Sequence, residues 1–169
     1  MLQSITFHKL NPLAQIPTRA HRNDAGVDLR SLEEINIKPF ESQIISTGLT
    51  VVLPTNTFGM ICLRSGLGFK HNLMIPNAPG IVDEGYKGEI RICIYNLSKQ
   101  TYTIKEQERV AQLVIVPTEY NPIRLTGDNN IEDNIPYPIL SFDFSQNPLL
   151  KSPFNPDRGE GGFGSSGQF

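Results

Sequence analysis

Short apolar segments, broken every few residues by Gly, Pro or Asn, fill the chain from the N-terminus to about residue 117. They are rich in Ile, Val, Thr, Tyr and Phe, which pack well on pleated strands. No long window carries an apolar stripe of helical period, and the one helical candidate is a turn or two within SGLGFKHNL, residues 65–73. The pattern therefore predicts an all-β domain, either a sandwich or a closed barrel. The expected strands are SITFHKL, GVDLRS, INIKP, QIISTG, LTVVLP, FGMICL, GEIRICIYNL, TYTI and VAQLVIVP.

One strand indicates which of its faces meets the core. Side chains alternate between the two faces of a strand, so Ile90, Ile92 and Ile94 of IRICIYN share a face that we expect in the core. The opposite face carries Arg91, Cys93 and Tyr95. This second face is too mixed for a core and too apolar for open solvent. Two interpretations stay open for it: a contact between subunits, or a half-exposed strand.

Length and charge exclude several partners and locations. The 169 residues suit one domain, and a formal net charge of -2 with interspersed signs argues against binding to nucleic acid or an anionic membrane. The start, MLQSITFHKL, lacks the layout of a signal peptide, and the apolar runs are too short to span a bilayer. We expect a cytoplasmic location, with the nucleus as the alternative. There Cys62 and Cys93 would be reduced thiols rather than a disulfide.

The composition changes after Pro117, and this change sets the expected domain boundaries. Residues 118–157 are dense in Asn, Pro and Asp, and a loop of this length without its own structure is unusual inside a compact domain. We expect 1–117 to form the β-barrel core and 118–157 to lie extended along its own or a neighbouring subunit's surface. The last segment, RGEGGFGSSGQF at 158–169, has five glycines in twelve residues and is expected to be flexible.

Four stretches place polar residues where strands meet glycine-rich turns. DAGVDL sets Asp28 within a strand, and RSGLGFKHNL places Arg64, Ser65 and Gly66 directly after one. Exposed amides and a guanidinium at such a position suit phosphate oxygens. NAPGIVDEGYKGEI has Asp83 after two apolar residues, and the terminal glycine-rich segment is the fourth stretch. Each stretch alone also fits an ordinary structural role, such as a strand-end hydrogen bond, a surface ion pair, a tight turn or a disordered end.

Together, in order and spacing, these stretches resemble the five motifs of the homotrimeric dUTPase family, which hydrolyses dUTP to dUMP and pyrophosphate. AGVDLRS is similar to the first motif, RSGLGFKHNL to the second, GIVDEGYKGEI to the third, ERVAQL to the fourth and RGEGGFGSSG to the fifth. The likeness spans the chain apart from residues 117–157, which are longer than the usual family linker. Three places depart from the family pattern. His71 and Asn72 stand where a residue-Gly pair is usual, Gly85 where many members have Asp, and Gln107 and Glu108 where Gly-Asp is common.

The resemblance implies a jelly-roll-like β-barrel with an extended C-terminal arm, and it also implies a site. Asp83 would be the general base that activates a water for in-line attack on the α-phosphorus. Tyr86 would pack against the deoxyribose, and uracil would lie beside a β-hairpin over 73–82, stacked under Phe163. The expected phosphate-binding residues are Arg64, Ser65, Gly66, Gln112, Arg158, Gly164, Ser165 and Ser166, and the expected nucleoside-binding residues are Asn77, Gly80, Ile81, Val82, Tyr86 and Phe163. A Mg²⁺ ion would bridge phosphate oxygens, with Asp28 contacting its waters rather than the metal.

The resemblance further implies a homotrimer that shares its sites. One site would take its phosphate-binding motifs from one subunit, the 73–82 hairpin from a second and the arm from a third. The activity would keep uracil out of DNA and supply dUMP for thymidylate synthesis. One rival is dCTP deaminase, which shares the fold, but no carboxylate between Ile90 and Asn96 matches its catalytic Glu. The other rival is a non-enzymatic binding module of the same fold, and the intact set of motif residues argues against it.

Overall fold

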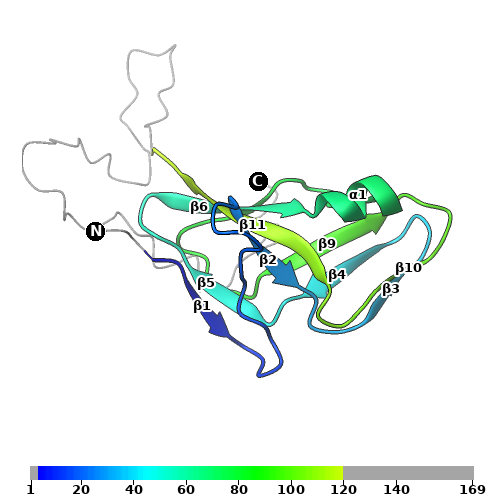
Figure 1. Ribbon diagram of the computed structural model, residues 1–169, viewed down its shortest axis with the longest axis horizontal. Coiled ribbons are helices and arrows are strands. Elements are labelled where there is room, and N and C mark those ends of the chain that lie inside the picture. The colour runs from blue at the N-terminus through cyan, green and yellow to red at the C-terminus, as the bar shows by residue number, and fades with distance from the viewer. Residues whose placement is uncertain (1–3, 120–169) are drawn as a thin grey trace, which may run out of the picture.

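A computed structural model describes residues 4–119, which form β-strands and one short helix (Figure 1). The helix, α1, spans Ser65–His71. The strands are β1 Thr6–Lys9, β2 Gly26–Arg30, β3 Ile35–Ile37, β4 Ser42–Ser46, β5 Leu49–Val52, β6 Thr57–Leu63, β7 Leu73–Met74, β8 Gly80–Val82, β9 Arg91–Asn96, β10 Tyr102–Ile104 and β11 Arg109–Pro117. Nearly all of the predicted 118–157 segment, and the whole of 158–169, lie outside the described residues.

The strands form small antiparallel sheets around one hydrophobic core. The largest has the order β2-β11-β6-β8, and a second has the order β4-β9-β7. Two further sheets pair β1 with β5 and β3 with β10. In Figure 1 the long strand β11 runs through the middle of the domain, and α1 sits at one end of it, directly after β6. The structure confirms the all-β prediction and the helical turn expected near residues 65–73.

Alternation along the strands fills the core. Ile90, Ile92 and Ile94 are at most 2% exposed, as predicted for the core face of the IRICIYN segment that contains β9. Val27 and Leu29 of β2 are also buried, at 6% and 0% exposed. Burying an aliphatic side chain of this size contributes about 1.5–3 kcal/mol, so these rows of side chains hold the two larger sheets together.

The segment 73–82 differs from the hairpin expected there, and that prediction was wrong. β7 pairs with β9, whereas β8 pairs with β6, so the two strands belong to different sheets. A turn in which the Ala78 N–H donates to the Ile75 carbonyl at 3.1 Å, and a cis bond between Ala78 and Pro79, lie between them. Both strands still contribute to the shared core, where Leu73 and Val82 bury their side chains.

The two cysteines agree with the expectation of reduced thiols. Cys62 on β6 and Cys93 on β9 are free and half-buried. Among residues 4–119, no helix has the length and apolar character needed to cross a membrane.

Asn72 and Gln107 stand where the family usually has glycine, and both keep the positive φ that glycine adopts easily. Asn72 ends α1 in the left-handed region, at φ 53° and ψ 40°, and its N–H donates to the Gly68 carbonyl at 3.1 Å. Gln107 has a φ of 62° in the turn before β11. Asparagine tolerates this conformation better than most residues. The Gln107 side-chain amide donates to the Leu13 carbonyl at 3.1 Å, which stabilises its position in the turn.

The left-handed position of Asn72 predicts opposite outcomes for two small substitutions. Asn72→Ala should lower the free energy of unfolding by about 1 kcal/mol, because alanine meets the steric penalty of positive φ. Asn72→Gly should be neutral or stabilising, since glycine meets no such penalty. Urea denaturation of both variants against the unchanged protein measures the difference. Equal stability of the two variants would contradict the assigned conformation.

Candidate active site

Three neighbouring strands bring polar side chains into one row on the outer face of the largest sheet. In the register of the sheet, Gln112 of β11 lies opposite both Asp28 of β2 and Cys62 of β6. Opposed residues in an antiparallel pair point to the same face. Gly26 belongs to the same face, and a Cβ there would lie 3.0 Å from the Cβ of Gln112. Gly26, which begins GVDL, therefore makes room for the Gln112 side chain.

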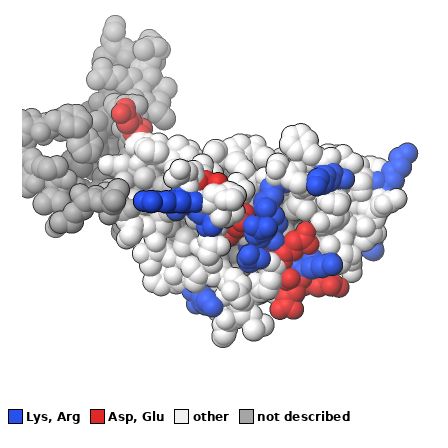
Figure 2. Space-filling model, viewed as in Figure 1, with Lys and Arg blue, Asp and Glu red and all other residues white. Residues whose placement is uncertain are grey.

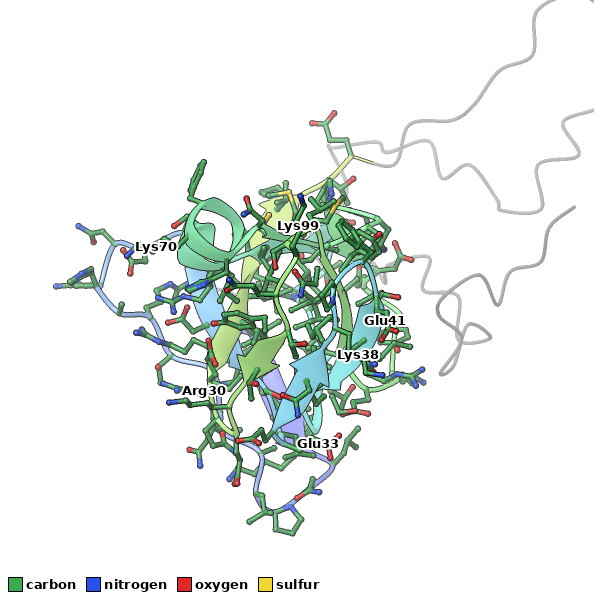
Figure 3. The ribbon with its side chains drawn as sticks, turned by 90° about the vertical axis from the view of Figure 1, so that its right-hand side faces the viewer. Arg30, Glu33, Lys38, Glu41, Lys70 and Lys99 are labelled. Carbon is green, nitrogen blue, oxygen red and sulfur yellow. The ribbon has the colours of Figure 1, made fainter. Side chains whose placement is uncertain are left out.

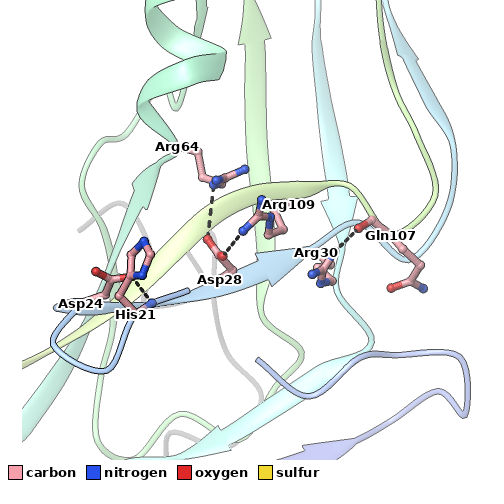
Figure 4. A network of polar contacts seen from close by, with 7 residues as sticks. All are labelled: His21, Asp24, Asp28, Arg30, Arg64, Gln107 and Arg109. Atoms are coloured by element: carbon pink, nitrogen blue, oxygen red, sulfur yellow. Dashed lines mark hydrogen bonds and ion pairs between the residues drawn. The ribbon is translucent and has the colours of Figure 1, made fainter. Parts of the chain in front are cut away.

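The Asp28 carboxylate is the centre of this row. It is only 7% exposed, and each of its oxygens faces an arginine (Figure 4). Arg64 Nε lies 3.3 Å from Oδ1, an ion pair without the alignment of a hydrogen bond, and Arg109 Nη1 donates to Oδ2 at 3.1 Å. A buried carboxylate is costly to remove from water unless it is paired. The two arginines supply that compensation.

Arg64 reaches Asp28 because of where β6 stops. β6 ends at Leu63, the Arg64 N–H donates to the Val110 carbonyl of β11 at 3.1 Å, and α1 begins at Ser65. Ser65 and Gly66 in the first turn of α1 are exposed beside it. A Cβ at Gly66 would meet no atom of the described chain within 4 Å. The turn thus leaves open space at Gly66, two residues after Arg64.

The surroundings of Asp28 carry excess positive charge. Arg30 lies directly opposite Arg109 in the sheet, and its Nη1 donates to the Gln107 carbonyl at 2.8 Å. Figure 2 shows basic side chains gathered over the middle of this face, with acidic ones beside them. In the side view of Figure 3, Arg30 and Lys70 lie on one side of the domain, and Lys38 and Glu41 lie on the other. An anionic ligand fits this face better than a cation does.

The turn before β11 is tied to the end of α1. The Tyr102 hydroxyl donates to Glu108 Oε1 at 2.9 Å, and the other Glu108 oxygen accepts the Lys105 N–H at 2.9 Å. Burial and this hydrogen bond to Glu108 raise the pKa of Tyr102 to about 12, because both disfavour the phenolate. The His71 ring, 4.7 Å from the Tyr102 ring, packs against it from α1. Glu108, which stands where Asp is common in the family, therefore stabilises the turn before β11 through these two hydrogen bonds.

The residues expected around the nucleoside lie elsewhere on the chain. Asp83 follows β8 directly, and the Tyr86 N–H donates to the Asp83 carbonyl at 3.0 Å, which closes the tight turn. The Tyr86 ring packs against the core, and its hydroxyl donates to the Glu89 carbonyl at 2.9 Å. A Cβ at Gly88 would lie 2.5 Å from that hydroxyl, so a larger residue there would displace the Tyr86 ring.

The pairing of β8 with β6 places Asp83 far from Arg64 within one chain. Val82 of β8 lies opposite Gly59 of β6, whereas Arg64 comes five residues later, after the far end of β6. At about 3.3 Å per residue, Asp83 and Arg64 of one chain are about 15 Å or more apart. The structure thus brings together Asp28, Arg64 and Gln112, with Ser65 and Gly66 beside them. It does not bring Asp83 to them.

The remaining predicted residues fall into two sets. Gly80, Ile81 and Val82 form β8, which pairs with β6, while Asn77 lies between β7 and β8 and Tyr86 follows Asp83. Arg158, Phe163, Gly164, Ser165 and Ser166 lie outside the described residues.

Sequence reasoning missed Arg109, although it lies in the quoted stretch ERVAQL. Simple alternation along β11 gives Arg109 the same parity as Ala111 and Leu113, which are at most 1% exposed. The register shifts between Arg109 and Ala111, because two steps along β11 match one step along β2, from Arg30 to Leu29. This bulge turns Arg109 to the face that carries Asp28.

Comparison with known proteins gives consistent matches. The pattern that defines the dUTPase family matches residues 13–135. A deoxyuridine 5'-triphosphate nucleotidohydrolase of Clostridium kluyveri is 38% identical over 159 residues, covering 94% of each chain. A solved mutant of the dUTPase from phage phi11 of S. aureus, described with a structural Mg(II) ion, is 29% identical with a TM-score of 0.69, covering 75% of this chain and 99% of that one. A mutant dUTPase of Staphylococcus bacteriophage 80alpha, solved with dUpNHpp, is 29% identical with a TM-score of 0.67, covering 76% and 98%.

Fold and matches together define an all-β nucleotide hydrolase. The family match over residues 13–135 identifies the particular family within this class. The chain belongs to the dUTPase family. The family that the resemblance indicated and the jelly-roll-like fold that it implied are confirmed.

Proposed function

We propose that this protein hydrolyses dUTP to dUMP and pyrophosphate, and that the Asp28 face binds the triphosphate. One observation carries this proposal: two arginines converge on one buried carboxylate beside an open glycine turn, in a chain of the dUTPase family. Arg64, Ser65, Gly66 and Gln112 would surround the phosphates, because a guanidinium and exposed amides suit their oxygens. Arg158, Gly164, Ser165 and Ser166 of the terminal segment would complete the phosphate contacts.

The nucleoside would be read at the 73–82 segment. Backbone groups near Gly80, Ile81 and Val82, with the Asn77 side-chain amide, would pair with the uracil edge and leave no room for the methyl group of thymine. A mismatched buried polar group costs about 1–3 kcal/mol, which suffices to reject cytosine. Tyr86 would exclude a ribose 2'-hydroxyl. Phe163 would stack on the base, a contact worth about 1–3 kcal/mol in base-aromatic pairs.

The long separation of Asp83 from Arg64 supports a site shared between subunits of a homotrimer. The outer faces of two sheets leave apolar side chains in solvent, which supports a contact between chains. Ile44, 49% exposed, lies opposite Cys93, and Met74, 37% exposed, lies opposite Tyr95. Ile81, on β8, is 54% exposed. We propose that such faces meet in the trimer and bring Asp83 of one subunit to the arginines of another.

Asp83 is the proposed general base. Its carboxylate would orient a water in line with the departing pyrophosphate and accept a proton from it as oxygen attacks the α-phosphorus. Phosphoryl transfer of this kind depends mainly on positioning and on charge stabilisation. The arginines of the Asp28 face would hold the phosphates so that this line of attack is kept.

The residues fit a Mg²⁺ ion that arrives with the phosphates. Within 4–119, no three His, Cys, Asp or Glu side chains gather as ligands for a metal. Mg²⁺ commonly keeps several waters and binds through substrate phosphates, so it does not need a protein cage. Asp28 would contact such waters at the edge of its carboxylate. The ion would offset negative charge on the triphosphate.

A substrate panel tests the proposed function. Pyrophosphate release should be seen with dUTP and Mg²⁺, and it should be far weaker with dTTP, dCTP or UTP. Chelation of the metal should lower the rate. Ammonia release from dCTP would instead indicate the deaminase, and a lack of turnover with all four nucleotides would indicate a binding module.

Substitution of Asp83 tests its role as the base. Asp83→Asn should lower kcat by at least about a hundredfold, as expected when a general base is lost, while dUpNHpp still binds. The matched control is Glu84→Gln, which removes the neighbouring carboxylate that accepts the Asn56 N–H at 2.9 Å. Steady-state turnover and calorimetric titration measure the two effects. A near-normal rate in Asp83→Asn would assign the base to another group.

Mixing two inactive variants tests whether the site is shared. Trimers assembled from equal amounts of Asp83→Asn and Arg64→Ala chains should regain about a quarter of wild-type turnover, because a random quarter of shared sites receives both intact residues. Unmixed samples of each variant serve as controls. If one chain supplied both residues of a site, no mixture would recover activity.

A further inference from the structure

Arg109 and Arg64 contact different oxygens of the Asp28 carboxylate. Arg109 Nη1 donates to Asp28 Oδ2 at 3.1 Å, and Arg64 approaches Oδ1 through its Nε, at 3.3 Å. Asp28 is 7% exposed, whereas the side chains of Arg64 and Arg109 are 33% and 38% exposed. A guanidinium has five N–H donors. Since Arg64 uses its Nε edge toward Asp28, its two terminal amino groups are left for a ligand.

The bulge in β11 determines the positions of both Arg64 and Arg109. Val110 is the extra residue of that bulge and is fully buried. The bulge turns Arg109 onto the Asp28 face, and the Val110 carbonyl accepts the Arg64 N–H at 3.1 Å. One local irregularity therefore fixes the backbone of Arg64 and the side-chain direction of Arg109.

We infer that Arg109 is a positioning residue, which acts through Asp28 to hold Arg64 in the orientation that binds phosphate. With Arg109 bound at Oδ2, Arg64 faces Oδ1 through its Nε, so the carboxylate holds it by one edge. Without Arg109, the carboxylate can turn and take the terminal amino groups of Arg64 on both oxygens, as a bidentate pair. Those groups would then compete for the phosphates. This inference rests on the proposed function, because it assigns the phosphates to Arg64.

The inference predicts a selective loss of triphosphate binding. In Arg109→Gln, the dissociation constant for dUpNHpp should rise about tenfold or more, as expected when a charge-assisted hydrogen bond is lost. Binding of deoxyuridine, which has no phosphate, should change less than about twofold. Calorimetric titration of each compound against the full trimer measures the split. A general loss of structure would weaken both compounds alike and would overturn the inference.

A double-mutant cycle tests whether Arg109 acts through Arg64. In the Arg64→Ala background, Arg109→Gln should cause little further loss of dUpNHpp affinity, since the residue that it positions is absent. Losses that add in full would show independent action and would overturn the inference. If Arg109→Gln does not fold, Arg109→Lys replaces it in the double-mutant cycle, because lysine keeps the charge but lacks the planar guanidinium. Its effect on dUpNHpp affinity should likewise be small in the Arg64→Ala background.

Arg30→Gln is the matched control. It removes the same charge from the position opposite Arg109, but Arg30 contacts the Gln107 carbonyl and not Asp28. Its effect on dUpNHpp should be smaller and should add to that of Arg64→Ala. Wild-type turnover of dUTP distinguishes failure of the proposed function from failure of the positioning role of Arg109. An inactive wild type refutes the proposed function, whereas an active wild type with normal dUpNHpp binding in Arg109→Gln refutes only the positioning role.

Discussion

The Asp28 carboxylate lies almost out of water between two arginines, and the geometry of the proposed phosphate-binding face depends on it. The two guanidinium groups offset the cost of keeping this carboxylate out of water. Each partner comes from a different strand end, Arg64 from the end of β6 and Arg109 from the start of β11. The ion pairs therefore join three strands at the point where a ligand would bind. The energy that keeps the carboxylate buried also orients the guanidinium groups.

Local irregularities, rather than regular strand geometry, place these groups. The bulge at Val110 changes the phase of β11, so the strand buries Ala111 and Leu113 and yet presents Arg109 beside Asp28. Asn72 and Gln107 hold left-handed conformations at the turns that flank α1 and β11. These residues differ from the expected glycines, but the backbone keeps the path that glycine allows. The turns thus tolerate a change of residue type more readily than a change of conformation.

The position of β8 limits what one chain can do alone. Because β8 runs antiparallel to β6 and pairs with Gly59, Met60 and Ile61, Asp83 follows β8 at the end of the sheet remote from Arg64. The proposed base and the proposed phosphate ligands meet only if subunits assemble. Exposed apolar side chains on β4, β7 and β8 support such an assembly. Under this proposal, oligomerisation is part of the active site and not only a source of stability.

The sequence by itself determined the all-β class, the core face of β9, the free thiols and the family, because these follow from period-two patterning and from short motifs. It also predicted that Asp28, Arg64 and Gln112 belong to one site, and the register of β2, β11 and β6 brings them together. Only the tertiary structure decided that residues 73–82 split between two sheets and that Arg109 joins Asp28. Pairing partners and bulges depend on contacts between segments far apart in the chain. A local pattern of side chains does not encode those contacts.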